Sequence, residues 1–182
     1  MKFYTPFQVQ TIHRLGPRNY NIDFKQSLTP MCILNNYAEL SYFLRYLKPL
    51  EEIPTISDIT VFKVGILPLW EDESNIAGCK WIIKLKREVC MRLFEKFLIR
   101  MCYSNFNTFD INGIALSIRS QHVIFSVWSK YTPENDQHKN IVKEIKETLG
   151  IEFFVSVEYK DNDESLKDNS SFRNTRTMKV MK

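Results

Sequence analysis

Three segments of the sequence would place positive side chains and an indole together on one face of a β-sheet. Residues 79–86, 113–120 and 122–129 each alternate apolar and polar side chains, as a strand with one buried face does. If the apolar sets face a core, the other face presents Lys80, Lys84, Arg119 and Trp128. An indole can stack on a base and cations can pair with phosphates, so this face is a candidate nucleotide site. A solvated face with one stray tryptophan gives the same pattern, and parity alone favours that simpler interpretation.

Three amphipathic segments have the period of helices that could pack on such a sheet. They are residues 36–48, 88–102 and 136–149. Each repeats apolar residues every three or four positions. Pro49 ends the first segment, while Asn135 or Asp136 can cap the start of the third and Gly150 can end it. The chain therefore alternates helices with strands.

Strand-like segments lie between these helices. We expect strands at residues 59–64, 79–86, 113–120, 122–129 and 151–159. The first 34 residues should contain one or two more. With a tight hairpin near residues 120–121, this order predicts an α+β fold, in which helices pack on one face of an antiparallel sheet.

The length and composition fit a single domain with a hydrophobic core. The chain has 182 residues, of which 44% are hydrophobic and 25% charged. We expect residues 1–160 to form the domain and residues 161–182 to form a polar loop and a basic tail. The formal net charge of +4 is too small to indicate a nonspecific nucleic-acid binder. It does permit an anionic ligand where positive side chains converge.

Cysteine spacing and glycine content argue against several other classes of site. The four cysteines form no C-x-x-C pair, so we expect free thiols and no metal or cofactor. The five glycines form no phosphate-binding loop, which argues against a Rossmann or P-loop site. No segment has the length and apolarity of a membrane helix, and the first residues do not resemble a signal peptide. A cytoplasmic protein with no membrane partner is expected.

The segment at residues 62–85, FKVGILPLWEDESNIAGCKWIIKL, carries a more specific signal. It resembles the eukaryotic translation initiation factor 4E family, in which this segment reads F-K-x-G-I-x-P-x-W-E-D and then N-x-x-G-G-x-W. The matching residues are Phe62, Lys63, Gly65, Ile66, Pro68, Trp70, Glu71, Asp72, Asn75, Gly78 and Trp81. A weaker likeness covers most of the chain, from about residue 5 to residue 159, and includes the nine-residue separation of Arg119 and Trp128.

The resemblance implies a strongly curved antiparallel sheet with three helices packed on its convex face. The concave face of this family binds the 7-methylguanosine 5′ cap of mRNA and holds the methylated guanine between two aromatic rings. By position, Trp70 is one ring and Phe24 the other, and a loop insertion would put Tyr20 in place of Phe24. Methylation at N7 makes the base a cation, which electron-rich ring faces attract.

The resemblance also assigns roles to residues around the two rings. Glu71 corresponds to the carboxylate that reads the base, because a carboxylate can accept both N1–H and N2–H of guanine. Trp128 corresponds to the residue near the N7 methyl group. Arg119 corresponds to a residue that meets the phosphates, and Lys80 stands where the family has a basic residue that supports this contact. Lys167, in the tail loop, is expected to help Arg119. A second phosphate-binding lysine of the family is replaced here by Ile124.

Two of these residues also have plainer interpretations. Trp70 follows Pro68 and could fold onto the core, as a lone tryptophan usually does. Glu71 could belong to a solvated acidic run with Asp72 and Glu73. Their position within a long, fixed-spacing motif favours the binding roles.

The family docks scaffold and repressor proteins on its convex helices through a Tyr-x-x-x-x-Leu-hydrophobic motif. The positions that the resemblance assigns to this surface are Pro6, Gln8, Tyr37, Ser41, Phe94 and Tyr103. Ser41 stands where the family has a large docking tryptophan, although Tyr42 and Phe43 follow it. One residue along a helix turns the side chain by about 100 degrees, so we expect weakened docking.

The resemblance therefore predicts a monomeric protein that binds capped mRNA and recruits it for translation initiation through a scaffold protein. Because of Ser41, a class-two cap-binding repressor that does not dock the scaffold normally is the alternative. A cap-processing enzyme would need a nucleophile, a metal cluster or a paired acid and base. The acidic residues at 71–73 are contiguous and do not converge, so the prediction is that the protein is not an enzyme.

Overall fold

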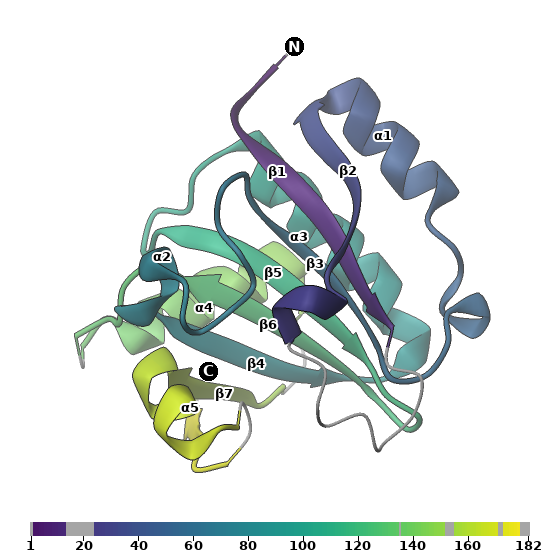
Figure 1. Ribbon diagram of the computed structural model, residues 1–182. Coiled ribbons are helices and arrows are strands. Elements are labelled where there is room, and N and C mark those ends of the chain that lie inside the picture. The colour runs from purple at the N-terminus through teal and green to yellow at the C-terminus, as the bar shows by residue number, and fades with distance from the viewer. Residues whose placement is uncertain (1, 14–23, 135, 152–154, 171–172, 179–182) are drawn as a thin grey trace.

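One antiparallel sheet organises the protein (Figure 1). The computed structural model describes residues 2–13, 24–134, 136–151, 155–170 and 173–178. Within them the sheet order is β2-β1-β3-β5-β6-β4-β7-β8. The strands are β1 (Lys2–His13), β2 (Thr29–Asn36), β3 (Ser57–Lys63), β4 (Cys79–Leu85), β5 (Ile111–Ile118), β6 (Val123–Ser129), β7 (Val157–Asp161) and β8 (Arg176–Met178).

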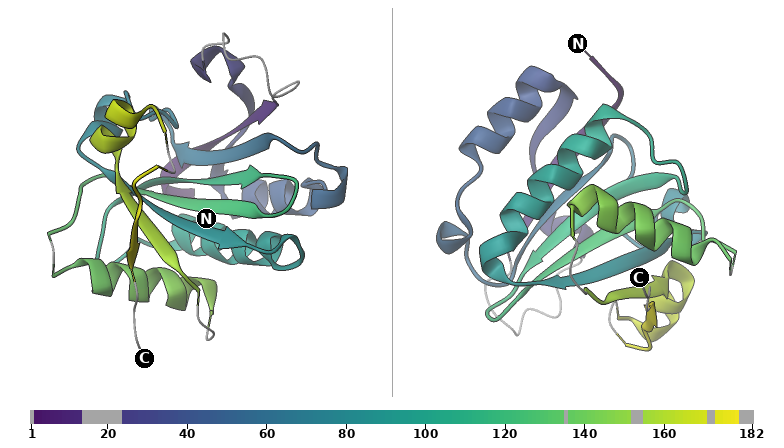
Figure 2. Two further views of the ribbon diagram at one scale, coloured as in Figure 1. Left: turned by 90° about the horizontal axis from the view of Figure 1, so that it is seen from below. Right: turned by 180° about the vertical axis from the view of Figure 1, so that it is seen from behind.

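Helices cover the two faces of this sheet unequally (Figure 2). One face carries α1 (Tyr37–Tyr46), α3 (Arg87–Tyr103) and α4 (His138–Leu149). The short helices α2 (Glu73–Ile76) and α5 (Asn162–Asp168) lie on the other side, as does the 3-10 turn η1 (Phe24–Ser27). A second such turn, η2, spans Leu50–Glu52. No helix in the described ranges is long and apolar enough to cross a membrane.

The expected fold class is confirmed, including the three helices on the convex face. Those three helices are α1, α3 and α4, whereas the short helices α2 and α5 were not predicted. The expected strands at 59–64, 79–86, 113–120 and 122–129 correspond to β3, β4, β5 and β6 within two residues at each end. The one or two strands expected in the first 34 residues are β1 and most of β2.

The core lies between the sheet and the three long helices. Trp81 and Ile83 of β4 and Phe125 of β6 are fully buried there, as the alternation in these strands predicted. Phe97 of α3 packs edge-on against Phe125, with ring centroids 5.2 Å apart. The indole Nε1–H of Trp81 donates to Ser129 Oγ at 2.8 Å, so its polar atom is satisfied inside the core.

The ends of the long helices follow from local chemistry. Asn36 caps α1, because its side chain accepts a hydrogen bond from the backbone N–H of Glu39 at 3.1 Å. Gly150 ends α4 in the left-handed conformation, at φ 65°. The prediction that Asp136 could cap α4 is wrong, since the helix begins at His138 and Gln137 holds the cap position. The other predicted cap, Asn135, lies outside the described residues.

The last part of the chain differs most from the prediction. A strand was expected at 151–159, but β7 begins at Val157; Ile151 lies outside it, and residues 152–154 fall outside the described ranges. The polar loop and tail expected at 161–182 are wrong where the chain forms a helix and a strand, and residues 171–172 and 179–182 lie outside the described ranges. Residues 162–168 form α5, and β8 pairs with β7 in antiparallel register. The described residues after 160 therefore add a short helix and, through β8, one edge strand of the same sheet.

A glycine in β5 positions an aromatic pair on the concave face. Gly113 lies opposite Phe62 of β3 and Trp128 of β6. A Cβ atom at Gly113 would come within 2.6 Å of both the Phe62 ring and the Val61 carbonyl oxygen. Because that space is free, the Phe62 ring packs edge-on against Trp128, with centroids 5.4 Å apart.

We expect Gly113→Ala to destabilise the protein by about 1–3 kcal/mol, the usual cost of overpacking a filled interior. The added methyl group must displace Phe62, which is fully buried. Denaturant unfolding measures this change, with Ser117→Ala on the same strand as the control. A Gly113→Ala protein as stable as the wild type would show that Phe62 has room to move.

Candidate functional site

The loop between β3 and α2 carries Trp70 and is held by the side chains of Asp72 and Asn75. Asp72 accepts hydrogen bonds from the backbone N–H of Leu67 at 2.9 Å and of Ser74 at 3.0 Å. The side chain of Asn75 donates to the carbonyl oxygens of Leu67 and Leu69, each at 2.8 Å. These bonds close the loop on itself, so its shape is defined by two residues of the recognised motif.

Two further asparagines tie this loop to distant elements. Asn112 of β5 donates to Ser74 O at 2.6 Å and to Asn75 Oδ1 at 3.0 Å. Asn162 of α5 donates to Asn75 O at 2.7 Å. Asn75, Asn112 and Asn162 are essentially inaccessible to solvent. Asn112 and Asn162 could not be predicted from the sequence, because a lone asparagine gives no signal of such long-range contacts.

Trp70, Lys80 and Trp128 converge on the concave face. The Lys80 ammonium lies 4.7 Å from the centroid of the Trp70 ring and 4.7 Å from that of the Trp128 ring. Both distances are within the range of cation–π attraction. Lys80 and Trp128 are direct cross-strand partners and are buried, whereas Trp70 is partly exposed. The predicted placement of Lys80 and Trp128 on one face is thus confirmed by the register.

The indole of Trp128 carries a polar atom that the described protein leaves unsatisfied. Its Nε1–H is buried and has no acceptor among the described residues. A buried donor of this kind costs free energy unless something accepts from it. The site therefore offers a hydrogen bond to an acceptor atom of a ligand.

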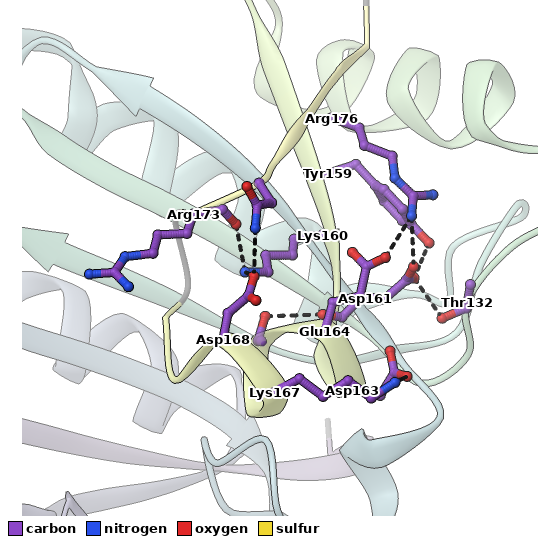
Figure 3. Close-up of polar contacts among 12 residues, drawn as sticks. Thr132, Tyr159, Lys160, Asp161, Asp163, Glu164, Lys167, Asp168, Arg173 and Arg176 are labelled. Atoms are coloured by element: carbon purple, nitrogen blue, oxygen red, sulfur yellow. Dashed lines mark hydrogen bonds and ion pairs between the residues drawn. The ribbon is translucent and has the colours of Figure 1, made fainter.

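A second buried lysine lies on the strand next to that of Lys80, and its bonds to the segment after β7 can be followed in Figure 3. Lys160 of β7 is the cross-strand partner of Lys80, and its side chain is fully buried. Its ammonium donates to Asp168 Oδ2 at 2.8 Å, Ser170 O at 2.8 Å and Arg173 O at 2.6 Å. These three acceptors lie in or just after α5, so Lys160 fixes this segment against the sheet.

The surroundings of Lys80 change its protonation. Burial, together with the positive charge of Lys160, lowers the pKa of Lys80 to about 7. A lysine in this range exchanges its proton near neutral pH.

Arg119 is held by several acceptors at the end of β5. Its guanidinium donates to Asp58 Oδ1 at 3.0 Å, to Ser57 O at 3.2 Å and to Ile118 O at 2.9 Å. Asp58 is almost completely buried. The guanidinium thus has a fixed position and a partly compensated charge. Sequence analysis singled out Arg119 but missed Asp58, which is 61 residues away along the chain.

The remaining residues that were predicted to bind the ligand are Glu71, Lys167 and Phe24. Glu71 is exposed beside Trp70. The Lys167 ammonium pairs with Asp163 at 2.9 Å on the exposed surface of α5, apart from Lys160 and its acceptors (Figure 3). Phe24 is the first residue of η1, but its side chain lies outside the described part, as does Tyr20. Among the described hydrogen bonds and ion pairs, Lys167 contacts none of the other residues that were predicted to bind the ligand.

The predicted docking positions differ in their exposure and contacts. Tyr37 packs edge-on against Phe3, with centroids 5.0 Å apart, and lies 6.0 Å from Tyr103. Ser41 and Tyr103 are exposed, and Pro6 and Gln8 of β1 are partly exposed. Phe94 is fully buried in the core, so the prediction that it contacts a partner is wrong for this conformation.

Neither aromatic residue after Ser41 takes the place of the missing tryptophan. Phe43 is buried in the core beneath α1. Tyr42 is exposed and packs against Tyr46, one turn along the helix, with ring centroids 4.6 Å apart. The helix therefore presents a small hydroxyl at the position that the resemblance assigns to a large docking residue.

The low pKa of Lys80 makes the stability of the protein depend on pH. The unfolded chain keeps this lysine charged up to its ordinary pKa of 10.5, whereas the folded protein releases the proton near 7. Between these values the unfolded state binds more protons, so stability rises with pH by about 1.4 kcal/mol per unit from this group. We expect the difference in unfolding free energy between wild type and Lys80→Met to change with this slope. Equal pH profiles for the two proteins would contradict the assignment.

Comparisons with known proteins agree with this fold. The family model described as "Eukaryotic initiation factor 4E" matches residues 4–177. Translation initiation factor NCBP of Oryza sativa subsp. japonica is 38% identical over 128 residues, covering 68% of this chain and 55% of the relative. Initiation factor 4E-4 of Caenorhabditis elegans is 30% identical over 154 residues, covering 84% and 73%. The chain spans a little more than half the length of the NCBP relatives that it matches.

Solved structures show the same architecture at low sequence identity. The C. elegans eIF4E-3 complex with the 4E-binding protein Mextli and a cap analog has a TM-score of 0.79 at 17% identity, covering 91% of this chain and 95% of that one. Ascaris suum eIF4E-3 with an m7G cap has a TM-score of 0.72 at 17% identity, covering 88% and 90%. These likenesses establish the fold, and the family model covers nearly the whole chain. The chain belongs to the eukaryotic initiation factor 4E family.

Proposed function

We propose that this protein binds the 7-methylguanosine 5′ cap of mRNA and recruits capped mRNA for translation initiation through a scaffold protein. The observation that carries the proposal is the convergence of Trp70, Lys80 and Trp128 on the concave face of a sheet of this family. The structural relatives include complexes with cap analogs, which supports a ligand of this class.

The base would bind through stacking and paired hydrogen bonds. Trp70 is partly exposed on a loop that buried asparagines hold in place, so one ring face is presented without a large cost in conformational entropy. Phe24 supplies the second ring, with Tyr20 as the alternative. Glu71 follows Trp70 directly, and its carboxylate can accept from N1–H and N2–H of guanine.

The phosphates would bind along the cations of the same face. Arg119 is fixed by Asp58 and two carbonyl oxygens, so it loses little freedom when an anion arrives. Lys80 and the unsatisfied Nε1–H of Trp128 supply further donors. Lys167 is engaged with Asp163 and must rotate away from it to contribute.

The proposal includes neither a catalytic step nor a resident cofactor, and it places a monomeric protein in the cytoplasm. Binding the cap requires recognition alone, and the groups assigned above all act by stacking, hydrogen bonding or charge. The relatives carry the names of translation initiation factors, which favours initiation over the class-two repressor. The partner would be a scaffold or repressor with a Tyr-x-x-x-x-Leu-hydrophobic helix, which the 4E-binding protein in one structural relative supports.

Trp70→Ala should weaken binding of 7-methylguanosine triphosphate by about 1–3 kcal/mol through the loss of stacking. The loss should be larger than for an uncharged base, because the methylated base also loses a cation–π attraction. Quenching of tryptophan fluorescence measures the affinity, with GTP as the unmethylated comparison. The matched control is Ile76→Ala, an exposed residue of neighbouring α2. Wild-type affinity in the Trp70→Ala protein would remove the core of the proposal.

Glu71→Gln should cost about 2–3 kcal/mol of cap binding, because one acceptor oxygen becomes a donor that faces a guanine N–H. Glu73→Gln, two residues along and also exposed, provides the control for a change of net charge. Calorimetric titration of both variants separates a loss of base recognition from an effect of net charge. If the two losses are equal, Glu71 is a surface acid and does not read the base.

Scaffold docking should be weak in the wild-type protein and stronger in Ser41→Trp. A large flat side chain at this position would restore the contact that dominates such interfaces. A fluorescently labelled peptide with the Tyr-x-x-x-x-Leu-hydrophobic motif measures both affinities. Nanomolar binding by the unchanged protein would show that Tyr37 and its neighbours have rebuilt the surface.

A further inference from the structure

We propose that Lys80 is a specificity-determining residue, whose ammonium competes with the positive ring of the cap for the indoles of Trp70 and Trp128 while attracting its phosphates. This inference rests on the proposed function and deepens it. It makes one side chain act in opposite directions on the two halves of the same ligand.

The first support is the position of the ammonium. Its Nζ atom is equally close to the two ring centroids, at 4.7 Å from each, and Lys80 is 2% exposed. The two indoles assigned to the methylated base thus already face a positive charge that belongs to the protein itself. The cation–π attraction of a ligand for a ring is weaker when another cation already polarises that ring. This holds on either face of the ring.

The second support is the way the strands hold the ammonium there. Lys80 lies between Trp128 of β6 and Lys160 of β7 in the sheet register. Lys160 is bound by Asp168 and two carbonyl oxygens, so it cannot move away from its neighbour without losing them. Two buried like charges on adjacent strands repel, and this repulsion disfavours a position of the Lys80 ammonium on the Lys160 side.

The third support is the sign of the charges on the ligand. The methylated base is positive and the triphosphate is negative, so a cation in a buried site repels the first and attracts the second. The pKa of Lys80 lies near 7, which lets the side chain lose its proton when a second cation comes close. Removing the charge should therefore strengthen recognition of the base and weaken recognition of the phosphates.

The test uses the full chain and three ligands: the nucleoside 7-methylguanosine, 7-methylguanosine triphosphate and GTP. Affinities are measured at slightly acidic pH, where Lys80 carries its proton and N1 of the base is protonated. We expect Lys80→Met to bind the nucleoside roughly fivefold more tightly than the wild type. The ratio of triphosphate to nucleoside affinity should fall, and discrimination between methylated and unmethylated triphosphate should rise.

Matched variants separate charge from structure. Lys80→Arg keeps the charge and should restore the wild-type preference between nucleoside and triphosphate. Lys143→Met makes the same exchange at an exposed position of α4, and should leave all three affinities unchanged. Lys80→Gln removes the charge but keeps a polar group, and it serves as the neutral variant if the methionine protein does not fold.

The outcomes distinguish this inference from the proposed function. If the wild type prefers the methylated triphosphate but a folded neutral variant binds the nucleoside no more tightly, the competition is absent and Lys80 acts on phosphates alone. If the wild type does not distinguish the methylated triphosphate from GTP, the proposed function and this inference fall together. If the neutral variant binds the nucleoside more tightly, and its affinity for the triphosphate rises less or falls, the result supports both the inference and the proposed function.

Discussion

The arrangement of the concave face depends on a buried amide, that of Asn75. Its side chain closes the Trp70 loop through two backbone carbonyls, while its own oxygen and carbonyl accept from Asn112 and Asn162. Such buried polar groups are costly when unpaired and specific when paired, because few geometries satisfy them all. The loop, the centre of the sheet and α5 are thus held in one relative position, and the place of the Trp70 ring follows from it.

A curved sheet with two buried faces explains why cations lie inside this protein. The convex face buries apolar side chains against α1, α3 and α4. The concave face buries Lys80 and Lys160, which a protein tolerates only where acceptors or ring faces compensate the charge. Lys160 has three oxygen acceptors, and Lys80 has two indoles within cation–π distance. Each buried charge therefore depends on the acceptors or rings that surround it.

Much of the fold followed from periodicity, because apolar alternation reports burial directly. It put Lys80 and Trp128 on one face, and the register of β4 and β6 makes them direct partners. Periodicity did not predict the elements whose polar residues are ordered by contacts distant in the sequence. Residues 162–168 read as a loop because the contacts that order them come from Lys160 and Asn75, whose burial no local pattern indicates. The ion pair between Arg119 and Asp58 could not be predicted for the same reason. The roles assigned to Glu71 and Phe24 rest on family resemblance.

The bond from Asn162 to Asn75 spans 87 residues and has a consequence for the order of assembly. Contacts between residues far apart in the chain form late, since a large loop must close before they can contribute. During synthesis the Trp70 loop leaves the ribosome long before α5 does, because chains grow at about 5–20 residues per second. The loop therefore waits several seconds for its last tether. A nascent chain that still lacks α5 therefore holds the Trp70 loop by fewer hydrogen bonds than the finished fold does.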